Sequence, residues 1–259
     1  MSDTLIIVPT YNERNNIQPL LDSIFECLAD THVLFVDDGS PDGTGELVDA
    51  ICAKDERIHI LHRTEKAGLG KAYIAGFKWA LEREYEFIFE MDADLSHEAA
   101  ALPRMRSAAD TADLVLGSRY MNGIRVINWP LKRLILSMGA GKYVRLILGM
   151  PFSDPTGGFK CFRRSVLETI ELDEVTSIGY SFQIELTYKA WTRGFKIVEE
   201  PITFTERTEG ESKIHKGIVK EAILVVWKLL GGHGFKRSGA KTPHERSVEY
   251  KGGGTPDPT

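Results

Sequence analysis

The sequence predicts an α/β fold of Rossmann-like type, in which a single domain is built around a mostly parallel central sheet. Three observations indicate this class. Short apolar runs recur early in the chain, and each is followed by an amphipathic stretch of helical period. Three of these runs lead directly into polar clusters, as in parallel sheets whose ligands bind beyond the carboxyl ends of the strands. The 259 residues are 42% hydrophobic and 27% charged, so the chain can bury a large core.

The first ninety residues alternate between predicted strands and helices. The strands are expected at residues 5–8, 33–36, 58–61 and 87–89, where short apolar runs are rich in β-branched and aromatic residues. The helices are expected at residues 15–28, 45–53 and 68–81, where the apolar residues recur with helical spacing. This order favours a parallel sheet with helices on both faces.

The second half of the chain is less regular. Residues 114–153 contain no Asp or Glu, although acidic residues outnumber basic ones in the whole chain. A strand is expected at 195–198, and a helical pattern runs from 214 to 230. After Gly231 the sequence consists largely of Gly, Pro and charged residues without periodicity. We therefore expect a main domain over residues 1–212, an amphipathic helix over 213–231 and a disordered tail over 232–259.

Composition and missing motifs exclude several function classes. The net charge of −5 argues against a nucleic-acid-binding protein. The first strand is not followed by GxGxxG, and GxSxG, HExxH and a complete phosphate loop are also missing. No apolar run reaches the roughly 18 residues of a membrane span, no signal-peptide pattern opens the sequence, and the three cysteines form no CxxC pair. We expect a cytoplasmic protein.

The strongest local signal is the pair Asp92 and Asp94 after the strand at 87–89. Carboxylates two positions apart on an extended chain point to the same side, and their oxygens suit a hard divalent cation. Ser96 or His97 could add a ligand or orient a water molecule. The alternative is a pair of acids that only solvates a strand end, but the apolar strand before them favours metal binding.

Two further polar clusters follow the first and second strands. Pro9, Tyr11 and Glu13 follow the first strand and could form a shelf for a nucleobase, although an ordinary strand-to-helix turn would be the better explanation if this segment stood alone. The segment 37–44, DDGSPDGT, combines turn residues with an acid, Asp38, that could accept hydrogen bonds from a base or ribose. The three clusters would converge on one crevice.

Together these segments resemble the family 2 inverting glycosyltransferases of the GT-A fold, and within them the dolichol-phosphate and polyprenol-phosphate mannose synthases. The matching segments keep their order between residues 5 and 213. They are PTYNERNNI (9–17), DDGSPDGT (37–44), MDADLSH (91–97), GSRY (117–120), LKRLILSMGA (131–140), DPTGGFKCFRR (154–164), GYSFQIE (179–185) and EEPITFTERTEGESK (199–213).

The resemblance implies a role for each matched position. The guanosine of GDP-mannose would be held by residues Pro9, Tyr11, Glu13, Val36 and Asp38. The diphosphate and a Mg²⁺ or Mn²⁺ ion would meet Asp92, Ala93 and Asp94, with Ser96 at the third metal-ligand position. Donor phosphates or sugar would be contacted by Arg119, Arg207 and Lys213, and the lipid phosphate by Arg133 and Ser137. Asp94, Arg119 and Arg133 are the expected catalytic residues.

The implied reaction is an inverting transfer of mannose to a polyprenyl (dolichyl) phosphate, which gives a β-mannosyl phosphate and GDP. Donor and acceptor are both anions, so the protein must neutralise both. The acceptor phosphate has a second pKa near ~6 and is already an anion at neutral pH, so it requires no general base. The alternative enzyme is a polyprenyl-phosphate glucosyltransferase that uses UDP-glucose.

Two segments suggest contact with the cytoplasmic face of a membrane. One half of the predicted helix at 214–230 is apolar, and the other half carries Lys216, Lys220 and Lys228. Such a helix either lies in a membrane interface or docks on the protein's own core, and the sequence favours neither. Residues 130–150 mix leucines with basic residues and, with Arg119, are expected to form an apolar, cationic mouth for the lipid. A membrane-spanning partner protein is a further possibility.

Overall fold

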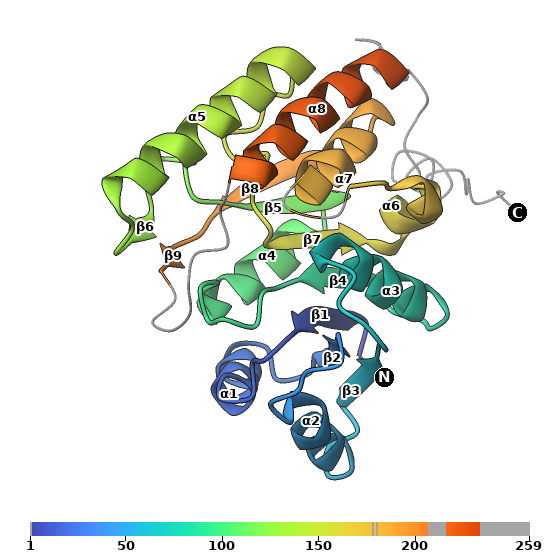
Figure 1. Ribbon diagram of the computed structural model, residues 1–259. Coiled ribbons are helices and arrows are strands. Elements are labelled where there is room, and N and C mark those ends of the chain that lie inside the picture. The colour runs from blue at the N-terminus through green and yellow to red at the C-terminus, as the bar shows by residue number, and fades with distance from the viewer. Residues whose placement is uncertain (1, 178, 180, 207–215, 234–259) are drawn as a thin grey trace, which may run out of the picture.

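The computed structural model describes residues 2–177, 179, 181–206 and 216–233, and its main sheet contains seven strands in the order β3-β2-β1-β4-β7-β5-β8 (Figure 1). The strands are β1 (Thr4–Thr10), β2 (His32–Asp37), β3 (Ile58–His62), β4 (Phe87–Glu90), β5 (Leu114–Ser118), β7 (Lys160–Arg163) and β8 (Ile197–Pro201). Strand β7 runs antiparallel to both of its neighbours, and the other pairs are parallel. The predicted mostly parallel sheet is confirmed.

Helices cover both faces of this sheet. They are α1 (Ile17–Cys27), α2 (Thr44–Cys52), α3 (Leu69–Leu81), α4 (Leu102–Ala108), α5 (Leu131–Leu148), α6 (Arg164–Thr169), α7 (Ser181–Thr192) and α8 (Lys216–His233), with short 3₁₀ turns at Ala99–Ala101 and Leu172–Glu174. Side chains alternate along β1: Leu5 and Ile7 pack toward α3, whereas Ile6 and Val8 lie in the core beneath α1, α2 and α4. The continuous apolar runs thus reflect strands that are buried on both faces.

A second, small sheet lies beside the carboxyl end of β4. Strand β6 (Val126–Ile127) pairs in parallel with β9 (Phe204–Thr205). The His97–Phe204 bridge and the hydrogen bond from the Thr205 amide to the Ser96 carbonyl (3.1 Å) attach this sheet to the turn after β4. It therefore brings the basic second half of the chain next to the acidic pair.

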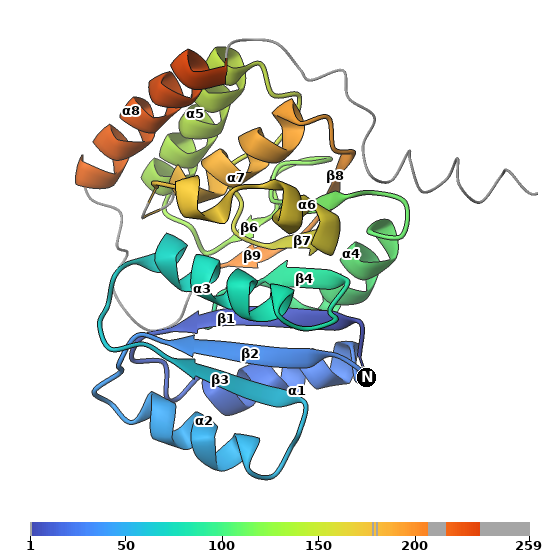
Figure 2. The ribbon, with the colours of Figure 1, turned by 90° about the vertical axis from the view of Figure 1, so that its right-hand side faces the viewer.

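Helices α5 and α8 lie side by side at the end of the molecule remote from β3 (Figures 1 and 2). Val226 and Leu229 of α8 are buried in the same core as Val144 and Leu148 of α5, so part of the apolar face of α8 docks on the protein itself. Leu224 and Trp227 of α8 remain exposed. In the part of the chain that the structure describes, no helix combines the length and apolarity needed to cross a membrane. The expected tail beyond residue 233 lies outside the described residues.

Candidate functional site

The polar clusters after β1, β2 and β4 lie at the same edge of the sheet, because these three strands are adjacent and parallel. Hydrogen bonds join the first two clusters: the amide of Asn12 donates to Ser40 Oγ (3.0 Å), and the amide of Glu13 donates to Thr44 Oγ1 (3.1 Å). Asp37 stabilises this corner by accepting bonds from Thr10 Oγ1 (3.0 Å) and the Ser40 amide (2.9 Å). The loop after β1 is therefore fixed by the turn after β2.

Asp38, predicted to contact the guanosine, forms an ion pair with Arg63 (2.8 Å) that the sequence analysis did not predict. Burial raises the pKa of the Asp38 carboxyl, while Arg63 opposes the rise. Lys66 lies over the ring of Tyr11 at 3.7 Å from its centroid, as a cation–π contact. Arg63 and Lys66 follow β3, so the third parallel strand also contributes to this edge. Arg63 and Lys66 could have been found from the sequence, because they belong to a basic segment directly after a predicted strand.

The other residues that were predicted to bind the donor differ in how far their side chains are exposed. Pro9, Tyr11 and Glu13 are partly exposed at the sheet edge. Val36 is wholly buried in the core, and Ala93 is almost wholly buried. A side-chain contact of Val36 with a nucleoside is thus not available in this structure.

The acidic pair is held by buried neighbours. Tyr73, from α3, donates its hydroxyl hydrogen to Asp92 Oδ1 (3.3 Å). His97 accepts the backbone N–H of Asp92 at Nδ1 (3.1 Å), which leaves its proton on Nε2, 3.9 Å from Asp92 Oδ2. Burial lowers the pKa of His97, so the ring is neutral at pH 7. The turn itself requires a positive φ of 60° at Leu95, a strained conformation that is typical of functional sites.

Asp94 and Ser96 complete a set of oxygen atoms that fits a hard cation. The amide of Ser96 donates to Asp94 Oδ1 (3.1 Å), which fixes the two residues relative to each other. Ser96 Oγ is buried and makes no hydrogen bond within the described part of the structure. Two carboxylates and one unsatisfied hydroxyl suit Mg²⁺ or Mn²⁺, with the remaining ligands supplied by a donor diphosphate or water. The described residues hold no group of three or more His, Cys, Asp or Glu side chains that could bind a metal alone.

The predicted basic residues gather on the other side of His97. Arg119, after β5, binds Asp154 through Nε (2.6 Å) and Nη2 (2.8 Å), and this pairing holds the pKa of Asp154 below its usual value despite burial. Arg133, in the first turn of α5, donates to both carboxylate oxygens of Glu206. Tyr120, the residue after Arg119, donates to Ser137 Oγ (2.7 Å), so Ser137 also lies close to these basic residues.

Aromatic rings connect the acidic and basic halves. Phe204 lies edge-on to both His97 (centroids 5.4 Å apart) and Trp129 (5.4 Å). Arg133 stacks over Trp129 at 4.2 Å, and Arg119 lies 5.6 Å from the same ring. His97, which lies beside Asp92, and both arginines therefore lie against one aromatic cluster. Arg207 and Lys213, which were also predicted to contact the donor, lie outside the described residues.

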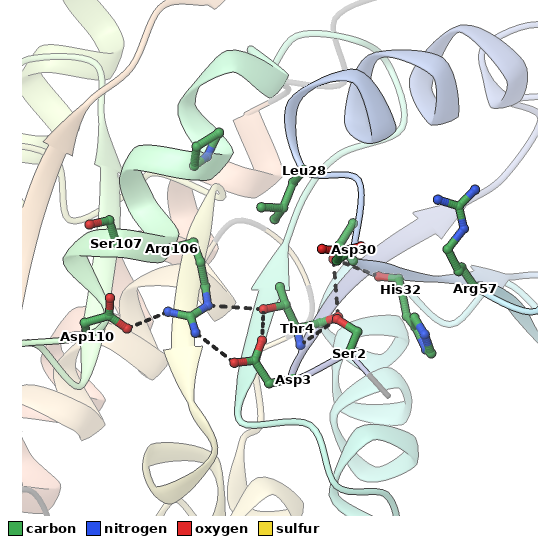
Figure 3. Close-up of a pocket in the computed structure, with 12 residues that line it drawn as sticks. Ser2, Asp3, Thr4, Leu28, Asp30, His32, Arg57, Arg106, Ser107 and Asp110 are labelled. Atoms are coloured by element: carbon green, nitrogen blue, oxygen red, sulfur yellow. Dashed lines mark hydrogen bonds and ion pairs between the residues drawn. The ribbon is translucent and has the colours of Figure 1, made fainter.

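A cavity of about 800 Å³ lies at the opposite end of the sheet, beside the first residues of β1 and β2 (Figure 3). Three of its charged side chains pair with one another: Arg106 binds Asp3 (2.8 Å) and Asp110 (2.7 Å). Because the amino ends of parallel strands rarely carry the ligand site, the strand-end cluster around Asp92 is the candidate functional site.

Comparison with known proteins agrees with this architecture. Residues 5–171 match glycosyl transferase family 2, and the chain belongs to this family of enzymes. It is 50% identical to the polyprenol monophosphomannose synthase of Mycolicibacterium smegmatis, over 88% of each chain. It is 47% identical to the undecaprenyl-phosphate mannosyltransferase of Micrococcus luteus, over 87% of this chain and 93% of the relative.

Solved structures confirm the predicted GT-A type of fold. The glucosyl-3-phosphoglycerate synthase of Mycobacterium tuberculosis, crystallised with Mn²⁺, UDP and glucosyl-3-phosphoglycerate, superposes with a TM-score of 0.63. The alignment covers 91% of this chain and 81% of that one, at 18% identity. At this identity the likeness concerns the fold alone.

Proposed function

We propose that this enzyme transfers mannose from GDP-mannose to the phosphate of a polyprenyl (dolichyl) lipid, with inversion, to give polyprenyl β-mannosyl phosphate and GDP. The observation that carries the proposal is that His97, beside Asp92 of the acidic pair, and both Arg119 and Arg133 lie against one aromatic cluster. Such a site can neutralise two anionic substrates side by side. Both bacterial relatives described above are named as mannosyltransferases or mannose synthases that use polyprenyl phosphates.

Each side of the site has a separate task in this reaction. Asp92 and Asp94, with Ser96, would hold a Mg²⁺ or Mn²⁺ ion, which stabilises the negative charge of the departing GDP. Arg133 and Ser137 would orient the acceptor phosphate. Arg119, Arg207 and Lys213 would contact the donor phosphates or sugar. The acceptor is already an anion at neutral pH, so the neutral His97 has no proton to accept and serves to position Asp92.

The nucleoside of the donor would bind at the edge formed by Pro9, Tyr11, Glu13 and Asp38, whereas the buried side chain of Val36 would not contact it. Arg63 and Lys66 extend this list, because they already contact Asp38 and Tyr11. Asp38 holds a hydrogen-bond acceptor near the edge, and Tyr11 offers an aromatic face. Ala93, with its small buried side chain, would let the diphosphate approach the backbone of the turn.

The proposal is tested by incubating the purified full chain and Mg²⁺ or Mn²⁺ with a polyprenyl phosphate and labelled GDP-mannose, UDP-glucose serving as the competing donor. We expect organic-soluble, acid-labile label from GDP-mannose and at most a minor amount from UDP-glucose. Faster transfer from UDP-glucose would instead support the glucosyltransferase alternative. No lipid-linked label from either donor would reject the proposed reaction.

Replacing Tyr73 by Phe is expected to weaken the metal site without unfolding the protein. The change removes only the hydroxyl group that donates to Asp92 Oδ1. Groups that orient metal ligands typically contribute about tenfold or more to metal affinity. We therefore expect the Mn²⁺ concentration at half-maximal transfer to rise by about tenfold.

Tyr143 provides the matched control for this substitution. Its hydroxyl is buried and makes no hydrogen bond within the described part of the chain, and it lies in α5. Tyr143→Phe should leave the Mn²⁺ titration unchanged. Equal titration curves for Tyr73→Phe and the wild-type enzyme would mean that Tyr73 does not orient the metal ligand.

The membrane surface is the second expected partner, and α5 and α8 are the proposed contact. Ten of the eleven large hydrophobic side chains exposed in the described residues lie between 124 and 146 or between 223 and 227. They are Ile124, Ile127, Leu131, Ile135, Leu136, Met138, Leu146, Ile223, Leu224 and Trp227. Exposed basic residues, including Lys132, Lys142 and Arg145, lie among them. An apolar patch with basic residues fits the surface of an anionic bilayer on the cytoplasmic side.

Replacing Leu131 and Leu146 by Asn should reduce membrane binding while leaving the fold intact. These side chains are 69% and 77% exposed, so their loss removes little packing within the protein. Burial of one leucine in a bilayer contributes about 1.5–3 kcal/mol, so each substitution should weaken binding by at least about tenfold. Co-sedimentation with phosphatidylglycerol vesicles measures the change. Unaltered sedimentation of the double variant would place the membrane contact elsewhere.

A further inference from the structure

We propose that Glu206 is the resting counter-ion of the acceptor site: its carboxylate holds Arg133 in the free enzyme, yields to the acceptor phosphate, and returns to Arg133 as product leaves. The inference rests on the proposed role of Arg133 and adds to it a residue that none of the sequence motifs assigned to the reaction. It makes Glu206 a residue that controls substrate entry and product release.

Glu206 is held beside the acidic pair by its backbone rather than by its side chain. Its amide donates to the Ile127 carbonyl (3.0 Å), and the preceding residue, Thr205, donates to the Ser96 carbonyl (3.1 Å). The side chain reaches from this fixed point to Nη1 of Arg133, whose guanidinium stacks over Trp129. The carboxylate can therefore leave Arg133 without any change in β9, which ends at the residue before Glu206.

The ion pairs Arg119–Asp154 and Arg133–Glu206 differ in how easily a substrate anion can replace the carboxylate. The Asp154 side chain is 0% exposed and accepts bonds from the backbone amide, Nε and Nη2 of Arg119. Separating this pair would leave a fully buried carboxylate, which is strongly unfavourable. The Glu206 side chain is 22% exposed and the Arg133 side chain 18% exposed, so Glu206 can turn into water at a much lower cost. An anion against Arg133 is favourable in both states, because the Arg133 Nε is buried and makes no hydrogen bond among the described residues.

The charge of each competing anion determines which anion binds Arg133 before and after mannosyl transfer. A phosphate monoester carries nearly two negative charges at pH 7, since its second pKa is about 6. It binds a guanidinium more strongly than a single carboxylate does, so it displaces Glu206 on entry. Mannosyl transfer converts the monoester into a diester with one negative charge. The product then binds Arg133 no more strongly by charge than Glu206, and the returning carboxylate favours its release.

The test compares wild-type enzyme with Glu206→Gln, using labelled GDP-mannose and farnesyl phosphate in detergent micelles. Without the competing carboxylate, we expect the KM for farnesyl phosphate and the inhibition constant of the mannosylated product each to fall about tenfold. Single-turnover transfer should stay within about twofold of wild type, whereas kcat should fall and a burst of product should appear. Glu206→Asp, which keeps the charge but shortens the reach, should show smaller shifts in the same direction.

Glu168→Gln is the matched control, because Glu168 forms a 2.6 Å ion pair with Arg164 on the surface of α6. Glu168→Gln should leave the KM for farnesyl phosphate, the inhibition constant of the product, the single-turnover rate and kcat unchanged. A higher KM for farnesyl phosphate in Glu206→Gln, with single-turnover and steady-state rates reduced together, would overturn the proposal and make Glu206 a brace for Arg133. Unchanged constants would also overturn it. Failure of the proposed function gives different results. If the reaction is wrongly assigned, the wild-type enzyme forms no lipid product. If Arg133 does not bind the acceptor, Arg133→Ala leaves the KM for farnesyl phosphate unaltered.

Discussion

Replacing Asp94 by Ala is expected to reduce mannose transfer by about a thousandfold, the largest effect on activity that the site predicts. Asp94 accepts a hydrogen bond from the Ser96 amide (3.1 Å) in the turn that follows β4. Apart from Asp92, no other residue of the Asp92–His97 turn carries a carboxylate. Without it, the proposed metal site keeps one carboxylate and one hydroxyl. The departing GDP would then lose most of its stabilisation.

Labelled GDP-mannose and polyprenyl phosphate measure this loss, with Mn²⁺ varied over a wide range. Asp94→Asn, which keeps the shape and removes the charge, should be nearly as inactive as Asp94→Ala. Asp173→Ala is the control, since Asp173 is 84% exposed and pairs only with Lys78 among the described residues. Metal-dependent transfer that persisted in Asp94→Ala would show that the acidic pair has been assigned the wrong role.

The first half of the fold could be predicted from the sequence because its local and tertiary preferences agree. Strands β1, β2 and β4 are buried on both faces, so their apolar runs are continuous and easily recognised. Parallel order then places their carboxyl ends together, which is why Tyr11, Asp38 and Asp92 could be expected at one edge. The structure confirms the mostly parallel sheet on which this expectation rests.

The partners of the site residues could not be predicted, because they come from distant parts of the sequence. Asp154 lies 35 residues from Arg119, and Glu206 lies 73 residues from Arg133. No periodicity or motif links such positions before the sheet order is known. Strand β7 was missed for a related reason: its sequence, KCFR, begins and ends with basic residues, and Lys160 is nevertheless buried. Strand β5, LVLGS, carries an apolar run, but it was not among the predicted strands either.

Lys160 and Glu90 form a buried polar group directly behind the acidic pair. They are opposite each other in the register of β4 and β7, and both are essentially unexposed. Lys160 Nζ donates to the backbone carbonyl of Gln183 (2.8 Å) and to its side-chain oxygen. Burial raises the pKa of Glu90 to about 8 and lowers that of Lys160 to about 8, while each charge partly offsets the shift of the other.

Replacing Lys160 by Met is therefore expected to lower the free energy of unfolding by about 2 kcal/mol, because it leaves the buried side-chain oxygen of Gln183 without its donor. The double replacement Glu90→Leu with Lys160→Met should recover part of this loss, since it also removes the buried carboxyl group of Glu90. Urea unfolding, followed by circular dichroism at pH 7, measures both values. A double variant as unstable as Lys160→Met alone would show that the methionine fails to pack, and that the buried carboxyl of Glu90 is not the cause.

The same pair should give the wild-type protein a characteristic dependence of stability on pH. Between pH 4.5 and about 8, folded Glu90 holds a proton that the unfolded chain has lost, so its contribution to stability falls as pH rises. Between about 8 and 10.5, unfolded Lys160 holds a proton that the folded chain has lost, so its contribution rises with pH. The two contributions together are lowest near pH 8. Subtracting the unfolding free energies of the double variant from those of the wild type at pH 6, 8 and 10 isolates this minimum. A flat difference would mean that both groups titrate in the folded protein as they do in the unfolded chain.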